Sequence, residues 1–186
     1  MKFSFSINHI LHFRGCLACE RCHGMTKGGK QCSRKTCIGS GWCHTHLLNE
    51  RHLRIQISTI PNAGKGLFVM HQTKAPGDII FKIGAKIIEY DGELVDKDTL
   101  QDRYEDETAP YGIHINRDRY EDGALHRGVG TLVNQSPRAN KTNARFGVSR
   151  NRIVLFSTKN IRNDQEIFVR YGNEYRFDEN TQYTTK

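Results

Sequence analysis

The sequence predicts a mostly β, β-rich α+β protein in which a small Cys/His module precedes a larger domain of short strands. All six cysteines lie between Cys16 and Cys43, which sets the start of the chain apart from the rest. After residue 52, short apolar runs alternate with clusters of turn-forming residues, a pattern typical of β-rich domains. A chain of 186 residues with 37% hydrophobic residues suits one domain of ordinary size with a small satellite.

The sequence also indicates an intracellular protein without a membrane partner. No apolar run approaches the roughly 18 residues that a membrane-spanning helix needs. The N-terminal stretch MKFSFSINHILHF is short, is broken by polar residues and lacks a small-residue cleavage site, so we interpret it as a mature N-terminus. Thiols stay reduced inside the cell, where a cluster of cysteines binds metal more often than it forms disulfides.

The Cys/His module spans residues 14–47. Its firmest element is Cys43-x2-His46, because this spacing lets a tight turn present two ligands to one zinc ion. Cys22 and Cys32 are the best further pair, since the sequence between them is typical of a loop closed on metal. Too few residues lie here for a core, so metal is expected to supply the folding energy. Three other cysteines leave alternative ligand sets open: Cys16, Cys19 and Cys37.

The same stretch resembles a small zinc-binding motif, C-x-G-x-T-K-x-G-x-x-C followed by C-x-x-H. The matching residues are Cys22, Gly24, Thr26, Lys27, Gly29, Cys32, Cys43 and His46. We expect removal of the metal to unfold residues 14–47 and to leave the following domain folded.

Charge is distributed unevenly along the chain. Residues 1–55 carry a net charge of +7 of the total +8, which favours contact with nucleic acid or with a nucleosome through the basic module. The alternative is a small domain kept soluble by Lys and Arg. Residues 89–107 carry nine acidic and two basic residues, which predicts a surface that attracts a basic peptide. A solvated face without a partner is the alternative there.

The larger domain is predicted over residues 53–177, after a short joint at 48–52 and before a polar tail at 178–186. A helix is expected over 93–104 and a shorter turn just before Asn134. The predicted strands are 53–58, 66–70, 78–83, 85–90, 111–115, 152–156 and 166–171.

The first candidate binding segment of this domain is Gly64-Lys65-Gly66-Leu67. Two glycines flank one residue, so the backbone can approach a ligand without a Cβ in the way. A simple hairpin turn is the alternative. The segment lacks the third glycine and the strand-to-helix context of a dinucleotide-binding loop, which disfavours a Rossmann-type enzyme.

Three further segments follow in order. Tyr90 closes a strand within Glu-Tyr-Asp-Gly-Glu, Asn134-Gln135-Ser136 forms a polar bend, and Tyr171-Gly172 ends the last apolar run. Together with the glycine segment, they resemble the SET-domain protein-lysine methyltransferases. That family transfers a methyl group from S-adenosylmethionine to lysine.

The resemblance implies a fold in which the C-terminal strand passes under a preceding loop in a knot-like arrangement. It implies that Tyr171 and Tyr90 are catalytic, with Tyr171 near the methyl group and Tyr90 orienting the lysine amine. It also implies that Phe146 lines the substrate channel, where the absence of a hydroxyl allows more than one methyl to be added. The implied cofactor-binding residues are Gly64, Lys65, Gly66, Leu67, Asn134, Gln135 and Tyr175.

Two departures from the family pattern stand out. Gln135 replaces a histidine and the sequence PRANKT separates Ser136 from Asn143, while no cysteine follows Tyr175. The leading hypothesis is a protein-lysine N-methyltransferase acting on a basic tail such as that of a histone, in the nucleus or a host nucleus. The alternatives are a zinc-dependent nucleic-acid or chromatin-binding module with an inactive SET domain, and a methyltransferase of a non-histone protein.

Overall fold

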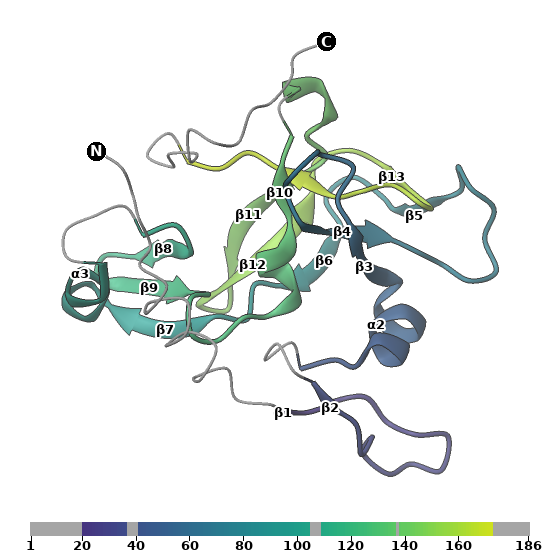
Figure 1. The fold of residues 1–186 in the computed structure, drawn as a ribbon, viewed down its shortest axis with the longest axis horizontal. Coiled ribbons are helices and arrows are strands. Elements are labelled where there is room, and N and C mark those ends of the chain that lie inside the picture. Colours follow the sequence, from purple (N-terminus) through teal and green to yellow (C-terminus); the bar gives the residue numbers. More distant parts are fainter. Residues whose placement is uncertain (1–19, 37–40, 105–108, 137, 173–186) are drawn as a thin grey trace.

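The computed structural model describes residues 20–36, 41–104, 109–136 and 138–172 (Figure 1). Within them the chain is mostly strand, with few helices, as the sequence predicts. The strands are β1 (Glu20–Arg21), β2 (Lys35–Thr36), β3 (Leu53–Ile57), β4 (Lys65–Val69), β5 (Ile79–Phe81), β6 (Lys86–Glu89), β7 (Glu93–Asp96), β8 (Gly112–Asn116), β9 (Arg119–Asp122), β10 (Asn134–Gln135), β11 (Ala144–Ser149), β12 (Arg152–Ser157), β13 (Ile161–Arg162) and β14 (Phe168–Val169). The helices are α2 (His44–Arg51), α3 (Lys97–Tyr104) and the 3-10 turns η1 (Val129–Leu132) and η2 (Ala139–Lys141).

Helix α2 occupies most of the segment that was predicted to be a short joint. It starts after Cys43, which is extended, and it ends at His52, whose φ of 54° is left-handed. The N–H of His52 returns to the Leu48 carbonyl at 3.2 Å, which satisfies part of the helix end. Arg51 in the last turn complements the helix dipole. The Cys/His module therefore runs directly into β3 through a helix.

The larger domain is built from small sheets of two or three strands (Figure 1). Strands β3 and β4 form an antiparallel hairpin, and β11, β12 and β6 form a three-stranded sheet in that order. The β11–β12 turn is tight because Arg150 and Asn151 both have positive φ, the geometry of the hairpin turns that match strand twist. Strand β11 had not been predicted from the sequence.

The predicted helix at 93–104 is wrong in its first turn. Residues 93–96 form strand β7, which pairs with β9 so that Val95 lies opposite Tyr120. The helix begins only at Lys97, and the N–H of Thr99 donates to Asp96 Oδ1 at 2.8 Å, an N-terminal cap. Pairing in the β7–β9–β8 sheet therefore overrides the helical propensity of the preceding residues.

Strand β14 returns to the middle of the domain and pairs in parallel with β10. Asn134 lies opposite Phe168 and Gln135 lies opposite Val169. The 3-10 turn η1 lies just before β10, as predicted. This pairing places the polar bend beside the end of the last apolar run.

One core holds the larger domain together, and the Cys/His module contributes to it. Leu47 from α2 is 2% exposed and belongs to the same buried cluster as the strands, while Trp42 packs against that cluster. The other buried members are Leu53, Leu67, Val69, Ile87, Ile88, Val129, Val133, Ala144, Leu155, Ile161, Ile167 and Val169. The two parts of the chain thus share apolar packing.

Candidate active site and metal centre

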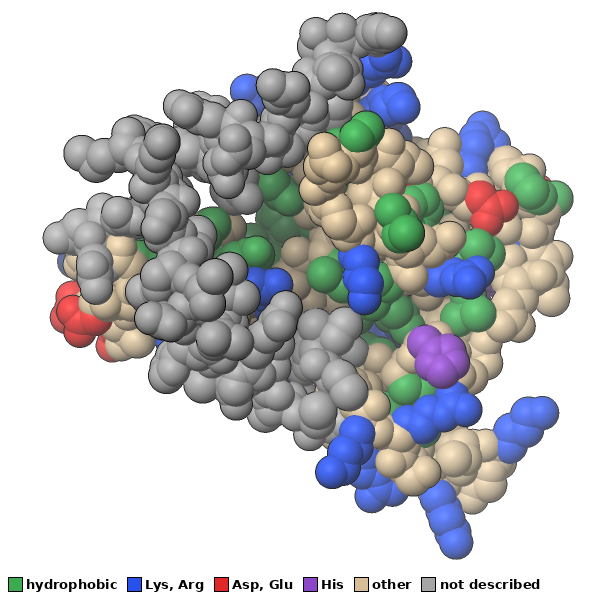
Figure 2. Space-filling view, viewed as in Figure 1, with side chains coloured by type: hydrophobic (Ala, Val, Ile, Leu, Met, Phe, Trp, Pro, Cys, Tyr) green, Lys and Arg blue, Asp and Glu red, His purple; other side chains and the backbone are tan. Residues whose placement is uncertain are grey.

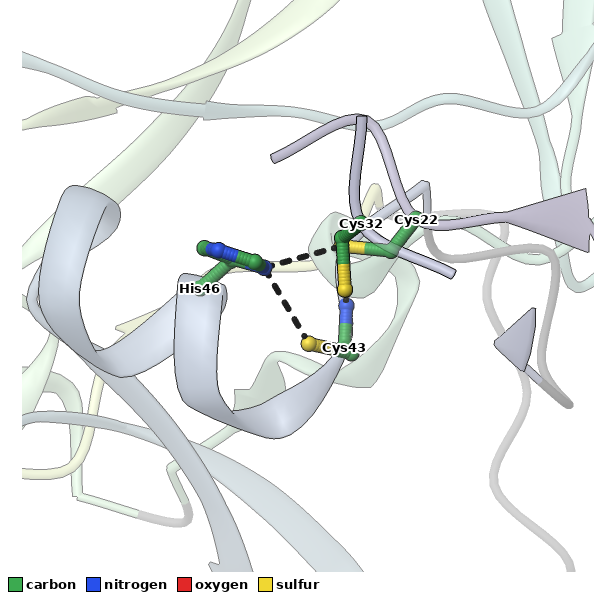
Figure 3. Close-up of side chains that lie close together, drawn as sticks. All are labelled: Cys22, Cys32, Cys43 and His46. Carbon is green, nitrogen blue, oxygen red and sulfur yellow. Dashed lines mark hydrogen bonds between the residues drawn. The ribbon is translucent and has the colours of Figure 1, made fainter. Parts of the chain in front are cut away.

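The Cys/His module gathers four potential metal ligands at one point (Figure 3). The thiol sulfurs of Cys22, Cys32 and Cys43 and a ring nitrogen of His46 all lie within 4.8 Å of one another. Nδ1 of His46 is 3.3 Å from the sulfurs of both Cys22 and Cys43. Three thiolates and one imidazole are a common donor set for tetrahedral zinc. The four residues that the spacing selected are therefore brought together.

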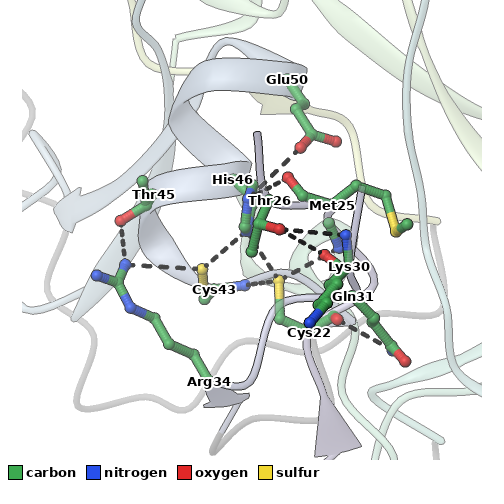
Figure 4. Close-up of polar contacts among 11 residues, drawn as sticks. Cys22, Met25, Thr26, Lys30, Gln31, Arg34, Cys43, Thr45, His46 and Glu50 are labelled. Carbon is green, nitrogen blue, oxygen red and sulfur yellow. Dashed lines mark hydrogen bonds and ion pairs between the residues drawn. The ribbon is translucent and has the colours of Figure 1, made fainter. Parts of the chain in front are cut away.

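Surrounding contacts orient these ligands (Figure 4). Nε2 of His46 lies 3.1 Å from the Met25 carbonyl and 3.7 Å from Glu50 Oε1. A proton held on Nε2 leaves Nδ1 free to coordinate, which is how second-shell partners fix a ligand histidine. The sulfur of Cys22 accepts the backbone N–H groups of Gly24 at 3.4 Å and Cys43 at 3.1 Å.

The electrostatics favour a thiolate at Cys43. Burial raises the pKa of this thiol, but the His46 backbone N–H and the side chains of Cys22, His46 and Arg34 outweigh burial and lower the pKa to about 6. Burial raises the pKa of Cys22. A metal ligand must be deprotonated, so the environment of Cys43 favours coordination by this thiol.

Gly24 is required by the approach of His46. A Cβ built on Gly24 would lie 2.3 Å from Cγ of His46, far inside contact distance. The loop from Cys22 to Cys32 can therefore pass the His46 imidazole only with glycine at position 24. Cys16, Cys19 and Cys37, the alternative ligands, lie outside the described residues.

Two hydrogen bonds hold Tyr171, which belongs to the second candidate site. The backbone N–H of Tyr171 donates to Gln135 Oε1 at 2.5 Å, and its hydroxyl donates to the Val133 carbonyl at 2.8 Å. Both bonds follow from the parallel pairing of β10 with β14. Sequence reasoning had left the role of Gln135 open, and its amide is here an acceptor for the backbone of Tyr171.

Tyr90 lies in a second buried cluster beside Phe146. It is 3% exposed, its ring meets the Phe146 ring edge-on at 5.6 Å between centroids, and its hydroxyl donates to the Tyr111 carbonyl at 2.8 Å. Burial, with Asp122 nearby, raises the pKa of Tyr90, so its hydroxyl stays protonated at neutral pH. Phe146 also packs against the main core, as does Tyr171. An aromatic wall therefore runs along the core.

The glycine segment lies next to the polar bend. Nδ2 of Asn134 donates to the Lys65 carbonyl at 3.1 Å. Gly64 has a φ of +72° and open space where a Cβ would stand, which suits close approach by a ligand. The side chain of Leu67 points into the core, so only its backbone is available to a ligand. Tyr175, the remaining predicted cofactor residue, lies outside the described residues.

Sequence reasoning assigned no role to Glu166, which holds the glycine segment in place. Its carboxylate accepts hydrogen bonds from the Ser58 hydroxyl at 2.6 Å and the Thr59 N–H at 2.7 Å, and Asn134 Nδ2 lies 3.3 Å away. A Cβ on Gly66 would lie 2.2 Å from Glu166 Oε1. The signal available in the sequence was a charged residue, Glu166, at the start of an apolar run.

A second group without an assigned role, Glu121 and Asp122, ties together segments that flank Tyr90 in the fold. Glu121 is fully buried and accepts the N–H groups of Gly92 at 2.9 Å and Ile153 at 2.6 Å, together with Arg152. Its neighbour Asp122 accepts the Tyr104 hydroxyl at 2.9 Å. These partners come from distant segments, so no local pattern indicated them.

The structure describes part of the acidic run at 89–107. Glu93 forms an ion pair with Arg103 at 2.9 Å, while Asp98 and Asp102 are exposed on α3. The described part of the run thus lies partly at the surface, which is expected both for a face that meets a basic peptide and for a solvated face without a partner. No helix among the described residues combines the length and hydrophobicity that crossing a membrane requires.

Solved structures with a similar fold come from polycomb repressive complex 2 of Chaetomium thermophilum. One, "ctPRC2 in an autoinhibited conformation bound to S-adenosylmethionine", is 20% identical with a TM-score of 0.53, covering 70% of this chain and 16% of that chain. A second, in complex with H3K27me3 and H3K27M, is 19% identical with a TM-score of 0.53 and the same coverage. A crystal structure of the complex is 20% identical with a TM-score of 0.51, covering 68% and 16%.

At these identities the likeness concerns the fold, and the chain spans about a sixth of the length of the solved chains that it matches. No curated protein sequence matches it significantly. The model of the SET domain matches residues 64–172, more than half of the chain and the whole stretch that contains the tyrosines, the glycine segment and the polar bend. The chain therefore belongs to the SET-domain family.

Proposed function

We propose that this chain is an S-adenosylmethionine-dependent protein-lysine N-methyltransferase. The observation that carries the proposal is the position of Tyr171, bonded through its N–H to Gln135 and through its hydroxyl to the Val133 carbonyl. Membership of the SET family supports the class of reaction.

The cofactor supplies an electrophilic methyl group on a sulfonium cation. The residues that would hold it are the backbone of Gly64 and Lys65, the Asn134 side chain and the main chain at Gln135. Their arrangement fits this role because Asn134 already contacts Lys65, and because the Cβ position of Gly64 is open. A related chain solved with S-adenosylmethionine bound has the same overall fold, which supports this choice of cofactor.

The protein's main task is to present a neutral lysine amine in line with the methyl group that is to be transferred. A free lysine has a pKa near 10.4, so its ammonium form must be disfavoured. An apolar wall built from Phe146 and Tyr90 would do this by desolvation, and a bound cofactor would add like-charge repulsion through its sulfonium cation. The Tyr90 hydroxyl donates a hydrogen bond to the Tyr111 carbonyl, so the lone pairs of its oxygen remain available to accept an N–H from the amine.

Once the amine is neutral, alignment supplies most of the acceleration. Correct placement of two reactants is worth a large effective molarity, so a strong general base is not obligatory. The Tyr171 hydroxyl and the Val133 carbonyl lie 2.8 Å apart and provide two oxygens on one side of the aromatic wall. Weak CH···O contacts from such oxygens would hold a methyl group in line.

The proposed substrate is a basic protein segment such as a histone tail, and the proposed location is chromatin in a nucleus or host nucleus. Exposed carboxylates on α3, including Asp98 and Asp102, support attraction of a basic peptide. A solved relative in complex with H3K27me3 supports a histone. We further propose that Cys22, Cys32, Cys43 and His46 hold Zn²⁺ as a structural ion.

The test is transfer of a radiolabelled methyl group to panels of histones, nucleosomes and other basic proteins, alongside calorimetric binding of S-adenosylmethionine. We expect cofactor binding and labelling of at least one lysine by the natural protein, and loss of labelling in Tyr171→Phe. Labelling confined to non-histone proteins would identify a different substrate class. Absence of cofactor binding and of transfer on every panel would instead favour a binding module with an inactive SET domain.

A further inference from the structure

The described part of the Cys/His module has a strongly basic surface away from the SET site. Between residues 20 and 36 the only acidic residue is Glu20. Figure 2 shows Lys and Arg side chains gathered at the end of the molecule where Figure 1 places β1 and β2. The basic face, as we define it, consists of the exposed residues Arg21, Lys27, Lys30, Arg34 and Lys35.

The loop that presents two of these lysines is fixed by its own hydrogen bonds. The N–H and the hydroxyl of Thr26 both donate to the Lys30 carbonyl, at 2.8 and 2.9 Å, and the Lys30 N–H donates back to the Thr26 hydroxyl at 3.2 Å. Gly29 has a φ of +74°, which closes the turn. Lys27 and Lys30 therefore project from a preorganised backbone, which lowers the entropy lost on binding.

The arginines and lysines of the basic face have different roles. Arg21 donates to the carbonyls of Cys32 at 2.9 Å and Gln31 at 2.8 Å, and Arg34 donates to the Thr45 hydroxyl, so both guanidinium groups brace the module. Within the described residues, the ammonium groups of Lys27, Lys30 and Lys35 have no protein partner. Three point charges on a rigid frame are thus left for an external anion.

Aromatic side chains of the module are not arranged to stack on bases. The only Trp, Tyr or Phe among its described residues is Trp42, which is half-buried and covered by the Arg51 guanidinium at 4.4 Å from the ring centroid. Single-stranded nucleic acids bind largely through such stacking, so a double strand recognised through its phosphates fits better. A membrane fits poorly, because Met25 is the only exposed large hydrophobic residue described in the module.

We propose that the basic face binds duplex DNA through the phosphate backbone, independently of base sequence. Lys27, Lys30 and Lys35 make the contacts, while the metal ligands and the two arginines hold them in position. Exposed lysines are suited to this role because each neutralised phosphate releases counterions, whatever the sequence. The inference does not depend on methyl transfer, since the binding surface lies on the module and requires no cofactor.

The experiment measures binding of the full zinc-loaded chain to fluorescent duplex DNA by anisotropy, from about 50 to 200 mM salt. The test variant carries Lys27→Gln, Lys30→Gln and Lys35→Gln. The matched control removes three exposed charges elsewhere, through Lys74→Gln, Lys82→Gln and Arg117→Gln. Zinc content and melting temperature of each variant are measured in parallel, so that a failure to fold is detected.

We expect the test variant to lose at least about tenfold in affinity at 0.1 M salt and to show a salt slope shallower by about 2.7, that is, 0.9 per phosphate contact. The control should lose much less, and two duplexes of unrelated sequence should bind equally. The proposal is overturned if the test and control variants bind alike. It is also overturned if single-stranded DNA or phosphatidylserine vesicles bind the natural protein more tightly than duplex DNA does.

Discussion

The side-chain oxygen Oε1 of Gln135 lies 2.5 Å from the backbone nitrogen of Tyr171, 36 positions later in the chain. This bond joins the polar bend to the end of the last apolar run, and so connects the proposed cofactor-binding residues with the proposed catalytic Tyr171. At the position where the family usually has histidine, the amide oxygen of Gln135 therefore has a structural role as a hydrogen-bond acceptor.

Replacing Gln135 tests whether this bond positions Tyr171. Gln135→Leu removes the acceptor at similar volume and leaves a half-buried N–H unpaired, at a cost of about 1–3 kcal/mol. We expect at least about a tenfold fall in kcat with a small change in substrate KM, since about 1.4 kcal/mol corresponds to tenfold in rate. Gln135→Glu retains an acceptor and should recover most of the rate. Equal activity of the leucine and glutamate variants would contradict the positioning role.

Gly24 offers a direct test of the metal centre. In Gly24→Ala the new Cβ would lie 2.3 Å from the His46 ring, so the imidazole must leave its position. We expect zinc affinity to fall by at least about tenfold, which is the effect of losing the contacts that support a metal ligand. Competition with a chromophoric chelator measures the affinity. Gly28→Ala is the matched control, because its Cβ would lie 4.0 Å from the Thr26 hydroxyl oxygen, an ordinary contact distance. Indistinguishable zinc affinities of the two variants would rule out this geometry.

Leu47 links metal binding to the stability of the SET domain. Its helix begins at the proposed metal ligands Cys43 and His46, and its side chain is buried among core residues of β3, β4 and β12. Chelation of zinc should therefore loosen the larger domain as well as the module, contrary to the independent unfolding expected from sequence. Hydrogen exchange of residues 152–157 before and after chelation is the measurement, and faster exchange is the expected result. Unchanged protection there would mean that the module unfolds alone.

The same link predicts a thermodynamic effect in the zinc-loaded protein. Leu47→Ala should lower the free energy of unfolding by about 2–5 kcal/mol, the usual range for emptying a leucine site in a core. Asn49→Ala, exposed on the same helix, should change it by no more than about 0.5 kcal/mol. Urea denaturation followed by circular dichroism separates the two. Similar losses in both variants would exclude burial of the Leu47 side chain as the cause.

The sequence predicted those parts of the molecule whose causes are local. The side chains of Cys22, Cys32, Cys43 and His46 lie together, and their spacing selected them because metal-ligand spacing is a short-range pattern. Six of the seven predicted strands overlap observed strands, because alternation and turn residues are also local. The seventh, 166–171, contains only the short strand β14. The hydrogen bonds between distant segments that limit this strand could not be predicted from the local sequence.

The misses share a physical cause in long-range contacts. Residues 93–96 resemble the start of a helix, yet pairing with β9 makes them a strand. Helix α2 has little amphipathic pattern, and the buried side chain of Leu47 packs it against the core of the larger domain. Glu121 finds its partners Gly92 and Ile153 about 30 positions away. Such contacts form only once the fold exists.

His52 makes stability depend on pH. Burial lowers the pKa of this histidine, and the neighbouring His71, whose ring lies 4.2 Å away between centroids, lowers it further. The unfolded chain then binds the proton more tightly than the folded protein, so stability is retained above about pH 6.5 and declines as pH falls below it.

His52→Asn provides the comparison, because Asn tolerates the left-handed backbone at this helix end. Urea denaturation at neutral pH and near pH 5.5 should show a smaller loss of stability in the variant than in the natural protein. Identical losses in both proteins would exclude His52 as the source.

The most direct test of the central claim is a single-turnover measurement of methyl transfer for the natural protein and Tyr171→Phe, with the dissociation constant of S-adenosylmethionine measured for both. Because the hydroxyl is proposed to act on the reacting methyl, we expect the rate of transfer to fall by about 100-fold or more while the dissociation constant stays within about threefold. An unchanged rate in Tyr171→Phe, or no transfer by the natural protein to any basic substrate, would contradict the account.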